Sequence, residues 1–414
     1  MTISNPQVEV MRQVLSLPVI VAALGYFIDI YDLVLFSIVR VPSLKGLGLA
    51  GQELINKGVF LLNMQMAGML IGGILWGILG DRKGRLKIMF GSILLYSLAN
   101  LANGMVTSVE AYAILRFVAG IGLAGELGAG ITLVSEVLHR TIRGYGTMIV
   151  ASVGVSGAIL ANFIAKEFDW RTSFIAGGVL GLLLLLLRLT VAESGMFKEM
   201  ASVDVARGNF LSLFTSRDRF GRFAHSILIG LPSWFVVGVL ITFSPEFAKV
   251  LAIQGTISAG NAVMYCYLGL VAGDLASGIL SQLLQSRKKV VLTFLLISVA
   301  AVAAYFCARG VSAGMFYGIC GLLGFGIGYW AIFVTVAAEQ FGTNLRATVA
   351  TSVPNFVRGM TIPITMLFQL SRKYLGIETG ALTVGALCLV IALVSLSRLQ
   401  ETFHKDLDYF EEFI

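Results

Sequence analysis

Charged residues are scarce in this sequence of 414 residues. They make up 13% of the chain, whereas 57% of its residues are hydrophobic. Because ordinary soluble domains carry about 25% charged residues, the composition excludes a soluble globular protein. It predicts a chain whose apolar segments cross a lipid bilayer repeatedly.

Cysteine and histidine are also rare, which limits the chemistry. The four cysteines fall in apolar stretches without metal-ligand spacing, and this predicts reduced core residues. None of the three histidines falls near the middle of such a stretch. A phosphate-binding loop and a nucleophile–base set are absent from the sequence as well. We therefore expect no metal site, no cofactor and no enzymatic or ATP-driven reaction.

Twelve apolar segments are long enough to span a membrane. They cover approximately 17–40, 57–80, 87–107, 110–138, 145–166, 171–192, 223–246, 259–284, 289–308, 312–340, 347–371 and 378–398. The predicted fold is an all-α membrane protein with twelve transmembrane helices. We expect no cleavable signal peptide, because the first stretch runs into a full-length span.

The basic residues predict the orientation of these spans. Lysines and arginines in the predicted inner segments outnumber those in the outer segments roughly two to one, if the N-terminus lies inside. Both termini are therefore expected in the cytoplasm. The positive net charge of +7 is explained as a topology signal, and we expect no nucleic-acid partner.

The polar stretch 193–222 divides the spans into two groups of six. We expect an N-terminal six-helix bundle at 1–192, a cytoplasmic linker at 193–222, a C-terminal six-helix bundle at 223–399 and a cytoplasmic tail at 400–414. A shift of 203 residues places Glu136 on Glu339 and Arg143 on Arg346. The halves thus form a weak parallel repeat, an architecture that places a substrate site between them at mid-depth.

The fourth span carries charges inside a glycine-rich stretch. Glu126 lies ten residues from both Arg116 and Glu136, so it is roughly 15 Å from each and near mid-membrane. A carboxylate there is a functional candidate by default. Arg116 either anchors this span to a neighbour or assists a proton relay.

Two aspartates in the first span are further candidates. Asp29 and Asp32 stand at i and i+3 and share a helical face. Together with Glu126 they are the predicted proton carriers, because a buried carboxylate that alternates between occluded and wet surroundings gains and loses a proton. One member of the pair could instead only bond a neighbouring helix.

Arg358 lies near the middle of the eleventh span, between Pro354 and Pro363. A lone guanidinium in a cavity of low dielectric attracts an anion and grips a carboxylate with two hydrogen bonds. The alternative is a structural ion pair, with Asp274 of the eighth span or an aspartate of the first span. In the repeat, Glu126 maps onto Tyr329 and Arg358 onto Val155, so these charges are poor candidates for a shared scaffold.

Aromatic side chains are the remaining substrate-binding candidates. The candidates lie on cavity-type spans and are Tyr26, Phe27, Tyr31, Trp234, Tyr265, Tyr329 and Trp330. We single out Trp234, Tyr329 and Trp330, because they follow Pro232 or a glycine run. Packing in the core is the alternative role for each of them.

Several motifs resemble the major facilitator superfamily over the whole chain. The segment Gly77-x-Leu-Gly-Asp81-Arg82-x-Gly84-Arg85-x-Lys87 is similar to the superfamily's loop between spans 2 and 3, and Arg116-x-x-x-Gly120-x-Gly122 to its span-4 motif. The resemblance implies two pseudo-symmetric six-helix bundles. It also implies a cytoplasmic gate network, for which a solvated loop is the alternative. Its members would be Asp81, Arg82, Arg85, Glu136 and Arg143, with Glu339 and Arg346 as the counterpart.

Finer resemblances point to several branches. The first span, Asp29-x-Tyr31-Asp32, is similar to phosphate:proton and metabolite:proton symporters, and Gly122-Leu-Ala-Gly125-Glu126 to the metabolite branch. Arg346 with Arg358 resembles the organic-anion transporters.

These resemblances imply a transporter in the cell inner membrane that imports a small organic anion with protons, and we expect it to act as a monomer. Inorganic phosphate:proton symport and efflux of a drug or metabolite by proton antiport are the alternatives. A receptor without transport activity is a further one.

Overall fold

The computed structural model describes residues 15–83, 85–126, 130, 138, 143–193, 210–403 and 411. In these ranges the chain is helical and forms no strand; an isolated bridge joins Gln254 and Ser312. The helices before the linker are α2 (Leu17–Gly46), α3 (Gly51–Lys83), α4 (Arg85–Asn103), α5 (Val109–Leu123), α7 (Arg143–Val155), α8 (Gly157–Glu167) and α9 (Trp170–Glu193).

The remaining elements follow residue 209. They are the 3₁₀ turn η2 (Phe210–Phe214), α10 (Arg217–Leu228), α11 (Leu231–Phe235), the π-helix η3 (Val236–Ile241), α12 (Ser244–Val250), α13 (Ala259–Leu284), α14 (Arg287–Cys307), α15 (Ala313–Gly326), α16 (Trp330–Glu339), α17 (Thr343–Gly359) and α18 (Thr361–Arg398).

An apolar sequence folds this way because helices satisfy their own backbone polar groups where water is absent. Serine caps begin several of them. Ser108, Ser286 and Ser312 each accept a hydrogen bond from the backbone N–H three residues later, at the starts of α5, α14 and α15. The helix starts are therefore encoded locally.

Nine segments in the described ranges are long and apolar enough to cross a membrane. The last, Thr348–Arg398, has 51 residues, about 76 Å of helix and more than twice the hydrocarbon thickness. It is interrupted at Gly376, whose φ of 80° lies in the region that favours glycine. Two predicted spans, 87–107 and 110–138, correspond to α4 and α5 and are not among the nine. The count of twelve therefore stays a prediction.

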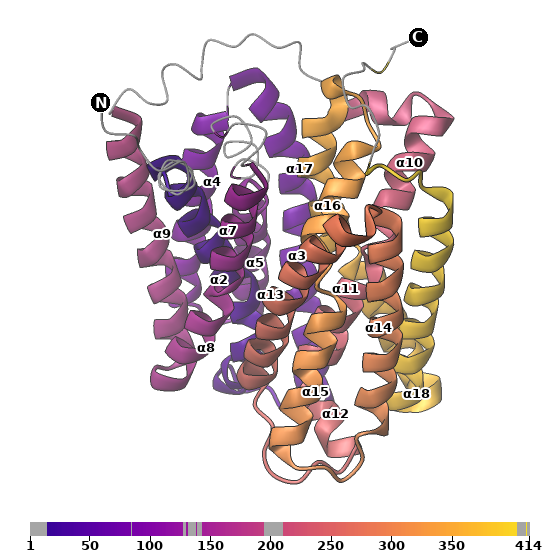
Figure 1. Ribbon diagram of the computed structural model, residues 1–414. Helices are drawn as coiled ribbons and strands as arrows, with labels where there is room; N and C mark the ends of the chain where they lie inside the picture. Colours follow the sequence, from indigo (N-terminus) through magenta and orange to yellow (C-terminus); the bar gives the residue numbers. More distant parts are fainter. Residues whose placement is uncertain are drawn as a thin grey trace, which may run out of the picture.

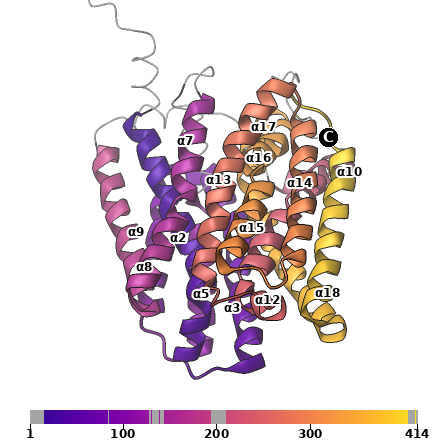
Figure 2. The ribbon, with the colours of Figure 1, turned by 60° about the horizontal axis from the view of Figure 1, so that its bottom comes forward.

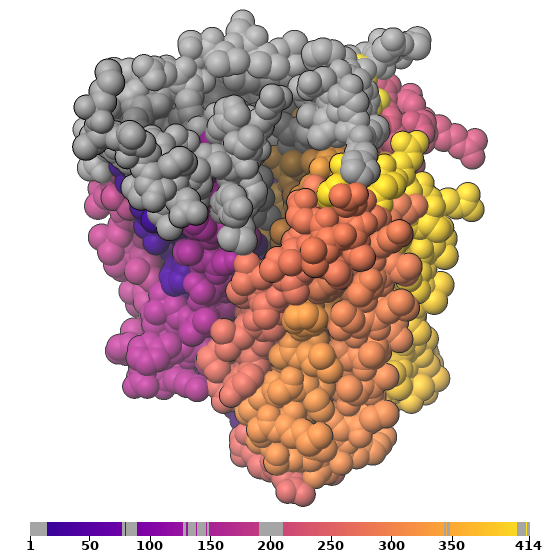
Figure 3. Space-filling model, viewed as in Figure 1, coloured from indigo at the N-terminus to yellow at the C-terminus, as the bar shows by residue number. Residues whose placement is uncertain are grey.

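The helices stand side by side in one bundle, as Figure 1 and Figure 2 show from two directions. Elements before the linker pack mainly on one another, as α3 does on α5 and α4 on α9, and so do later elements such as α13 and α15. The two groups meet where α2, α7 and α8 contact α13 and where α3 contacts α17 and α18. On the face in Figure 3 this boundary is a seam between magenta and orange surfaces.

Helices are broken near the middle of three predicted spans. α5 ends at Leu123, α15 ends at Gly326 before α16 begins at Trp330, and the seventh predicted span is divided into α10, α11, η3 and α12. Such breaks free backbone carbonyls, which need partners in a membrane. The hydroxyl of Tyr329 donates to the Ile229 carbonyl at 2.8 Å, and that of Tyr305 donates to the Leu240 carbonyl at 2.9 Å. The irregular backbone is thus stabilised by side chains and lies beside a cavity.

Candidate functional site

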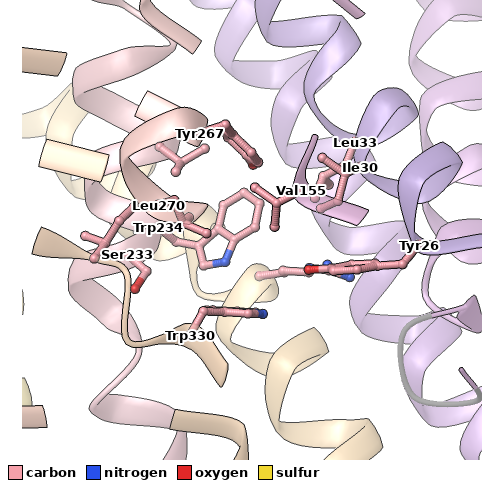
Figure 4. A pocket seen from close by; sticks show the side chains of 12 residues that line it. Tyr26, Ile30, Leu33, Val155, Ser233, Trp234, Tyr267, Leu270 and Trp330 are labelled. Atoms are coloured by element: carbon pink, nitrogen blue, oxygen red, sulfur yellow. The ribbon is translucent and has the colours of Figure 1, made fainter. Parts of the chain in front are cut away.

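A cavity lies between the two groups of helices, and its empty space, including the part open to solvent, is about 380 Å³. α2 and α7 contribute to one side, and α11, η3, α13, α16 and α17 contribute to the other. Its lining consists of Tyr26, Ile30, Leu33, Val155, Ser233, Trp234, Val237, Tyr267, Leu270, Ile327, Trp330 and Arg358. In Figure 4 the side chains of Trp234 and Trp330 extend toward Tyr26 on the opposite side. The breaks after Ile229 and Gly326 place both tryptophans here.

Arg358 is the only charged residue among the described residues that line this cavity. Its guanidinium is 1% exposed and lies 3.7 Å from the Asp29 carboxylate, measured from Nη2 to Oδ2. Its Nη1 donates a long hydrogen bond of 3.5 Å to the side-chain oxygen of Asn355. Within the described part of the chain, neither Asp29 oxygen nor Arg358 Nε has a hydrogen-bond partner. The pair is therefore loose, and guanidinium donors remain for a ligand.

Asn355 connects this arginine to the other group of helices. Its amide nitrogen donates to the Ala124 carbonyl at 3.0 Å, at the break that follows α5. An added Cβ on Gly73 of α3 would lie 2.7 Å from the Cβ of Asn355, so the two backbones are close. The Arg358 site is thus tied to both groups of helices.

Asp274 does not contact Arg358. Its Oδ1 accepts a hydrogen bond of 3.1 Å from the Ala331 backbone N–H and so caps the start of α16. Of the two partners expected for Arg358, the structure selects the aspartate of the first span. Asp274 instead holds the helix end that carries Trp330.

Tyr31 and Tyr329, like Phe27 and Tyr265, lie outside the cavity lining. The hydroxyl of Tyr31 donates to the Ser173 carbonyl of α9 at 2.8 Å, and Tyr329 bonds the Ile229 carbonyl. Both side chains are fully buried. In this conformation each side chain packs in the core and donates a hydrogen bond to a backbone carbonyl.

Glu126 forms a closed ion pair with Arg188 of α9. The two guanidinium nitrogens donate to its two oxygens at 3.1 and 2.9 Å, and Ser92 of α4 donates at 2.9 Å. Both charged side chains are buried. Gly25 of α2 lies against this pair, since an added Cβ would come within 2.1 Å of an Arg188 nitrogen. Glu126 is therefore held among α2, α4 and α9.

The side chains of Asp32 and Asp29 point in different directions. Three residues of α-helix amount to a turn of about 300°, so the two carboxylates diverge by about 60°. An added Cβ on Gly177 of α9 would lie 2.3 Å from the Asp32 carboxylate, and no described residue hydrogen-bonds either of its oxygens. Arg116 donates instead to the side-chain oxygen of Asn100 and lies over the ring of Phe174 at 4.5 Å. The structure thus connects Arg116 with α4 and α9.

Most of the predicted gate lies outside the described residues. This holds for Glu136 as a whole and for the side chains of Asp81, Arg82, Arg85, Arg143 and Arg346. Glu339 is described. It pairs with Arg287 at 3.5 Å and accepts a hydrogen bond of 2.6 Å from Thr402.

Polar contacts join the two groups of helices at the end of the bundle that holds α12, at the bottom of Figure 1. Arg40 of α2 is fully buried and pairs with Glu246 of α12 at 2.6 Å, and Phe243 covers its guanidinium at 4.2 Å. Thr242 donates to Ser37 at 3.0 Å nearby. Arg40, the last residue of the first predicted span, is therefore a buried contact. These bonds close this end of the interface.

Two residues of this arrangement, Arg188 and Tyr267, are missing from the sequence-based candidates. Arg188 is a single arginine in the leucine-rich run 182–189, and any ionisable residue in such a run is a functional candidate. Tyr267 lines the cavity, but no local pattern distinguishes it from a core tyrosine. Tyr26, a candidate from the sequence, also lines the cavity.

The family model described as Major Facilitator Superfamily matches residues 22–365 of the chain. This range contains every residue that lines the cavity.

Curated proteins of similar sequence carry transporter names. The niacin transporter NiaP of Acinetobacter baylyi is 26% identical over 79% of this chain and 80% of its own length. The sialic acid transporter NanX of Escherichia coli is 25% identical over 90% of this chain and 92% of its own length. The 3-(3-hydroxy-phenyl)propionate transporter of Escherichia coli is 28% identical over 77% of each chain.

Proposed function

Because the chain belongs to the Major Facilitator Superfamily, we propose that it imports a small organic anion, such as a carboxylate, together with protons by alternating access. It is a multi-pass membrane transporter and not an enzyme. The observation that carries the proposal is the buried, loosely paired Arg358 in a cavity between the two groups of helices.

Arg358 favours an anion for electrostatic reasons. A cation taken out of water loses hydration that the Asp29 carboxylate, at 3.7 Å, replaces only in part. A ligand carboxylate would supply two oxygens in the geometry that a guanidinium fork prefers. The substrate would therefore complete the hydrogen bonding of a group that the protein leaves incomplete.

The names of the relatives support an organic acid. Niacin, sialic acid and 3-(3-hydroxyphenyl)propionate all carry a carboxyl group, although their remaining structures differ. A carboxylate is thus their common feature, and Arg358 is the residue in the cavity that matches it.

We expect proton coupling because the substrate carboxylate and Asp29 compete for Arg358. When a substrate carboxylate binds the guanidinium, it displaces Asp29 from the cation with which the described residues pair it, and a proton neutralises Asp29 instead. When the substrate leaves, Arg358 again favours the charged form of Asp29, and the proton is released. Asp29 is therefore the first candidate for the proton carrier. Asp32 and Glu126 are the others.

The architecture of the proposal is two six-helix bundles, residues 1–192 and 223–399, with twelve spans in the cell inner membrane and both termini in the cytoplasm. We expect a monomer. The contacts of Arg40 with Glu246 and of Ser37 with Thr242 close one end of the interface. They would break when the transporter opens to that side.

Uptake into proteoliposomes under an imposed pH gradient tests the proposal. The substrates would be mono-, di- and tricarboxylates, aromatic acids, phosphate, neutral sugars and a cationic drug. We expect uptake of a carboxylate that requires the acidic side to be outside, with no uptake in Arg358→Ala. Uptake of phosphate alone, or drug movement against the proton flow, would select one of the alternative functions and contradict this one.

A further inference from the structure

We propose, on the basis of the organic-anion function above, that the substrate is a single-ring aromatic carboxylic acid held by Trp234 and Trp330. The carboxylate would meet Arg358, and the ring would lie against the two indoles. The inference comes from the cavity wall, whose aromatic rings, hydrogen-bond donors and aliphatic side chains each restrict the ligand.

Four aromatic side chains form much of the cavity wall. Trp234, Trp330, Tyr26 and Tyr267 come from four different helices and converge on one cavity. Figure 4 shows Tyr267 and Trp330 on opposite sides of Trp234, and Tyr26 reaching toward them from α2. Aromatic pairs favour edge-to-face and offset arrangements, which add to the free energy of burying the ring. A planar ring placed here could form such pairs from more than one side.

The polar side chains of the wall offer hydrogen-bond donors and few acceptors. Arg358 and the two indole N–H groups can only donate hydrogen bonds. Among the described lining residues there is no Asp, Glu, Asn, Gln or His, and the remaining polar side chains are the hydroxyls of Ser233, Tyr26 and Tyr267. A ligand rich in donors, such as an amine or a polyol, would leave its own groups unpaired, which costs free energy. A carboxylate has four acceptor sites and no donor.

Aliphatic side chains restrict the ligand further. Ile30, Leu33, Val155, Val237, Leu270 and Ile327 cover the remaining surface of the cavity. An apolar ring with a carboxylate fits this combination, whereas a hydroxylated sugar acid is too polar.

The experiment compares benzoate with cyclohexanecarboxylate as inhibitors of uptake of the carboxylate that the wild-type protein transports. The two acids share the carboxylate and the six-membered ring of carbons. Cyclohexane is the more hydrophobic ring, so a cavity that selects only by apolar area would prefer cyclohexanecarboxylate. We expect the opposite, with half-maximal inhibition by benzoate at a roughly three- to tenfold lower concentration.

The variants locate this preference in the tryptophans. Trp234→Leu and Trp330→Leu are expected to bring the ratio of the two inhibition constants close to one, while Trp234→Phe, which keeps a ring, retains most of the preference. Tyr112→Phe is the matched control, because Tyr112 of α5 is buried, lies outside the cavity lining and packs against Phe36 and Phe174; its ratio should equal that of the wild type. Monodisperse elution in detergent identifies variants that remain folded.

The outcomes separate this inference from the function on which it depends. Equal inhibition by both acids in the wild type, or a preference for cyclohexanecarboxylate, overturns the aromatic class while organic-anion transport stands. An unchanged benzoate preference in both folded leucine variants overturns the role of the tryptophans. If no carboxylate is taken up or inhibits, the proposed function itself fails.

Discussion

Two buried ion pairs in this molecule have similar members and different geometry. Glu126 and Arg188 both belong to helices before the linker and share two hydrogen bonds of 3.1 and 2.9 Å, with a third from Ser92. Asp29 and Arg358 belong to helices on opposite sides of the linker and are separated by 3.7 Å, and no described residue donates to the Asp29 carboxylate. The first pair is closed and the second is open.

The difference in geometry predicts different main roles for the two pairs, stabilisation of the fold for the closed pair and transport for the open one. Removing one partner of a closed buried pair leaves a charge that nothing else neutralises. An open pair next to a cavity can exchange one partner for a ligand, because few bonds are lost. We therefore expect changes in the first pair to alter stability and changes in the second to alter transport.

The largest effect is expected at Arg188. Arg188→Leu leaves Glu126 buried without its cation, which costs about 3–5 kcal/mol. We expect a large fall in the thermal unfolding temperature in detergent, and partial recovery in the double variant with Glu126→Gln. A single variant as stable as the wild type would show that the pair is not structural.

Arg358→Ala tests the open pair. The loss of a buried, hydrogen-bonded partner for the substrate charge should reduce uptake by roughly 100-fold or more, whereas the unfolding temperature should change less than in Arg188→Leu. Initial uptake rates and thermal unfolding on the same preparations measure both. The comparison fails if Arg358→Ala is the less stable of the two variants and still transports.

Asp29→Asn tests the coupling of substrate transport to protons. With one coupled proton, a pH difference of one unit supports roughly tenfold accumulation. We expect the variant to lose this accumulation but to retain exchange of labelled for unlabelled substrate. Glu126→Gln is the matched variant of the closed pair, and it should keep more of the pH-driven accumulation. The assignment of the proton to Asp29 is wrong if Glu126→Gln alone abolishes it.

The smallest effect on stability is expected at Glu401, a surface carboxylate whose oxygens are already hydrogen-bonded. Partial burial raises the pKa of Glu401, but hydrogen bonds from Ser286 and from the backbone N–H groups of Arg287, Phe403 and Lys288 outweigh it and lower the pKa to about 2. Its ordinary value is 4.5. The unfolded state therefore binds the proton first, and the stabilisation is present above about pH 4.5 and lost toward pH 2.

Glu401→Gln should accordingly destabilise the protein at pH 7 by less than about 1 kcal/mol, because the group is exposed to solvent. Unfolding temperatures at pH 7 and pH 3 measure the difference, which should shrink at the lower pH. A constant difference at both values would mean that the carboxylate charge contributes nothing.

Much of the fold follows from the sequence, because apolar length and serine caps are local signals. Arg358 and Trp330 are likewise found from composition, since a charge or a glycine-interrupted aromatic pair is conspicuous in an apolar span. The pairing of acidic with basic side chains does not follow from the sequence in this way. The spacing of Asp29 and Asp32 places them on one face, yet a turn of 60° directs one toward Arg358 and the other toward α9. Which cation meets which acid depends on helix packing between distant segments, and one sequence does not encode that visibly.

The π-helix at Val236–Ile241 has a further consequence for the cavity. Each residue in a helix advances the chain by about 100°, and a π-turn accommodates one residue more than an α-turn. Shortening this segment by one residue would rotate Thr242 away from its contact with Ser37, relative to Trp234. The length of the segment is thus as much a part of the binding site as the side chains that it carries.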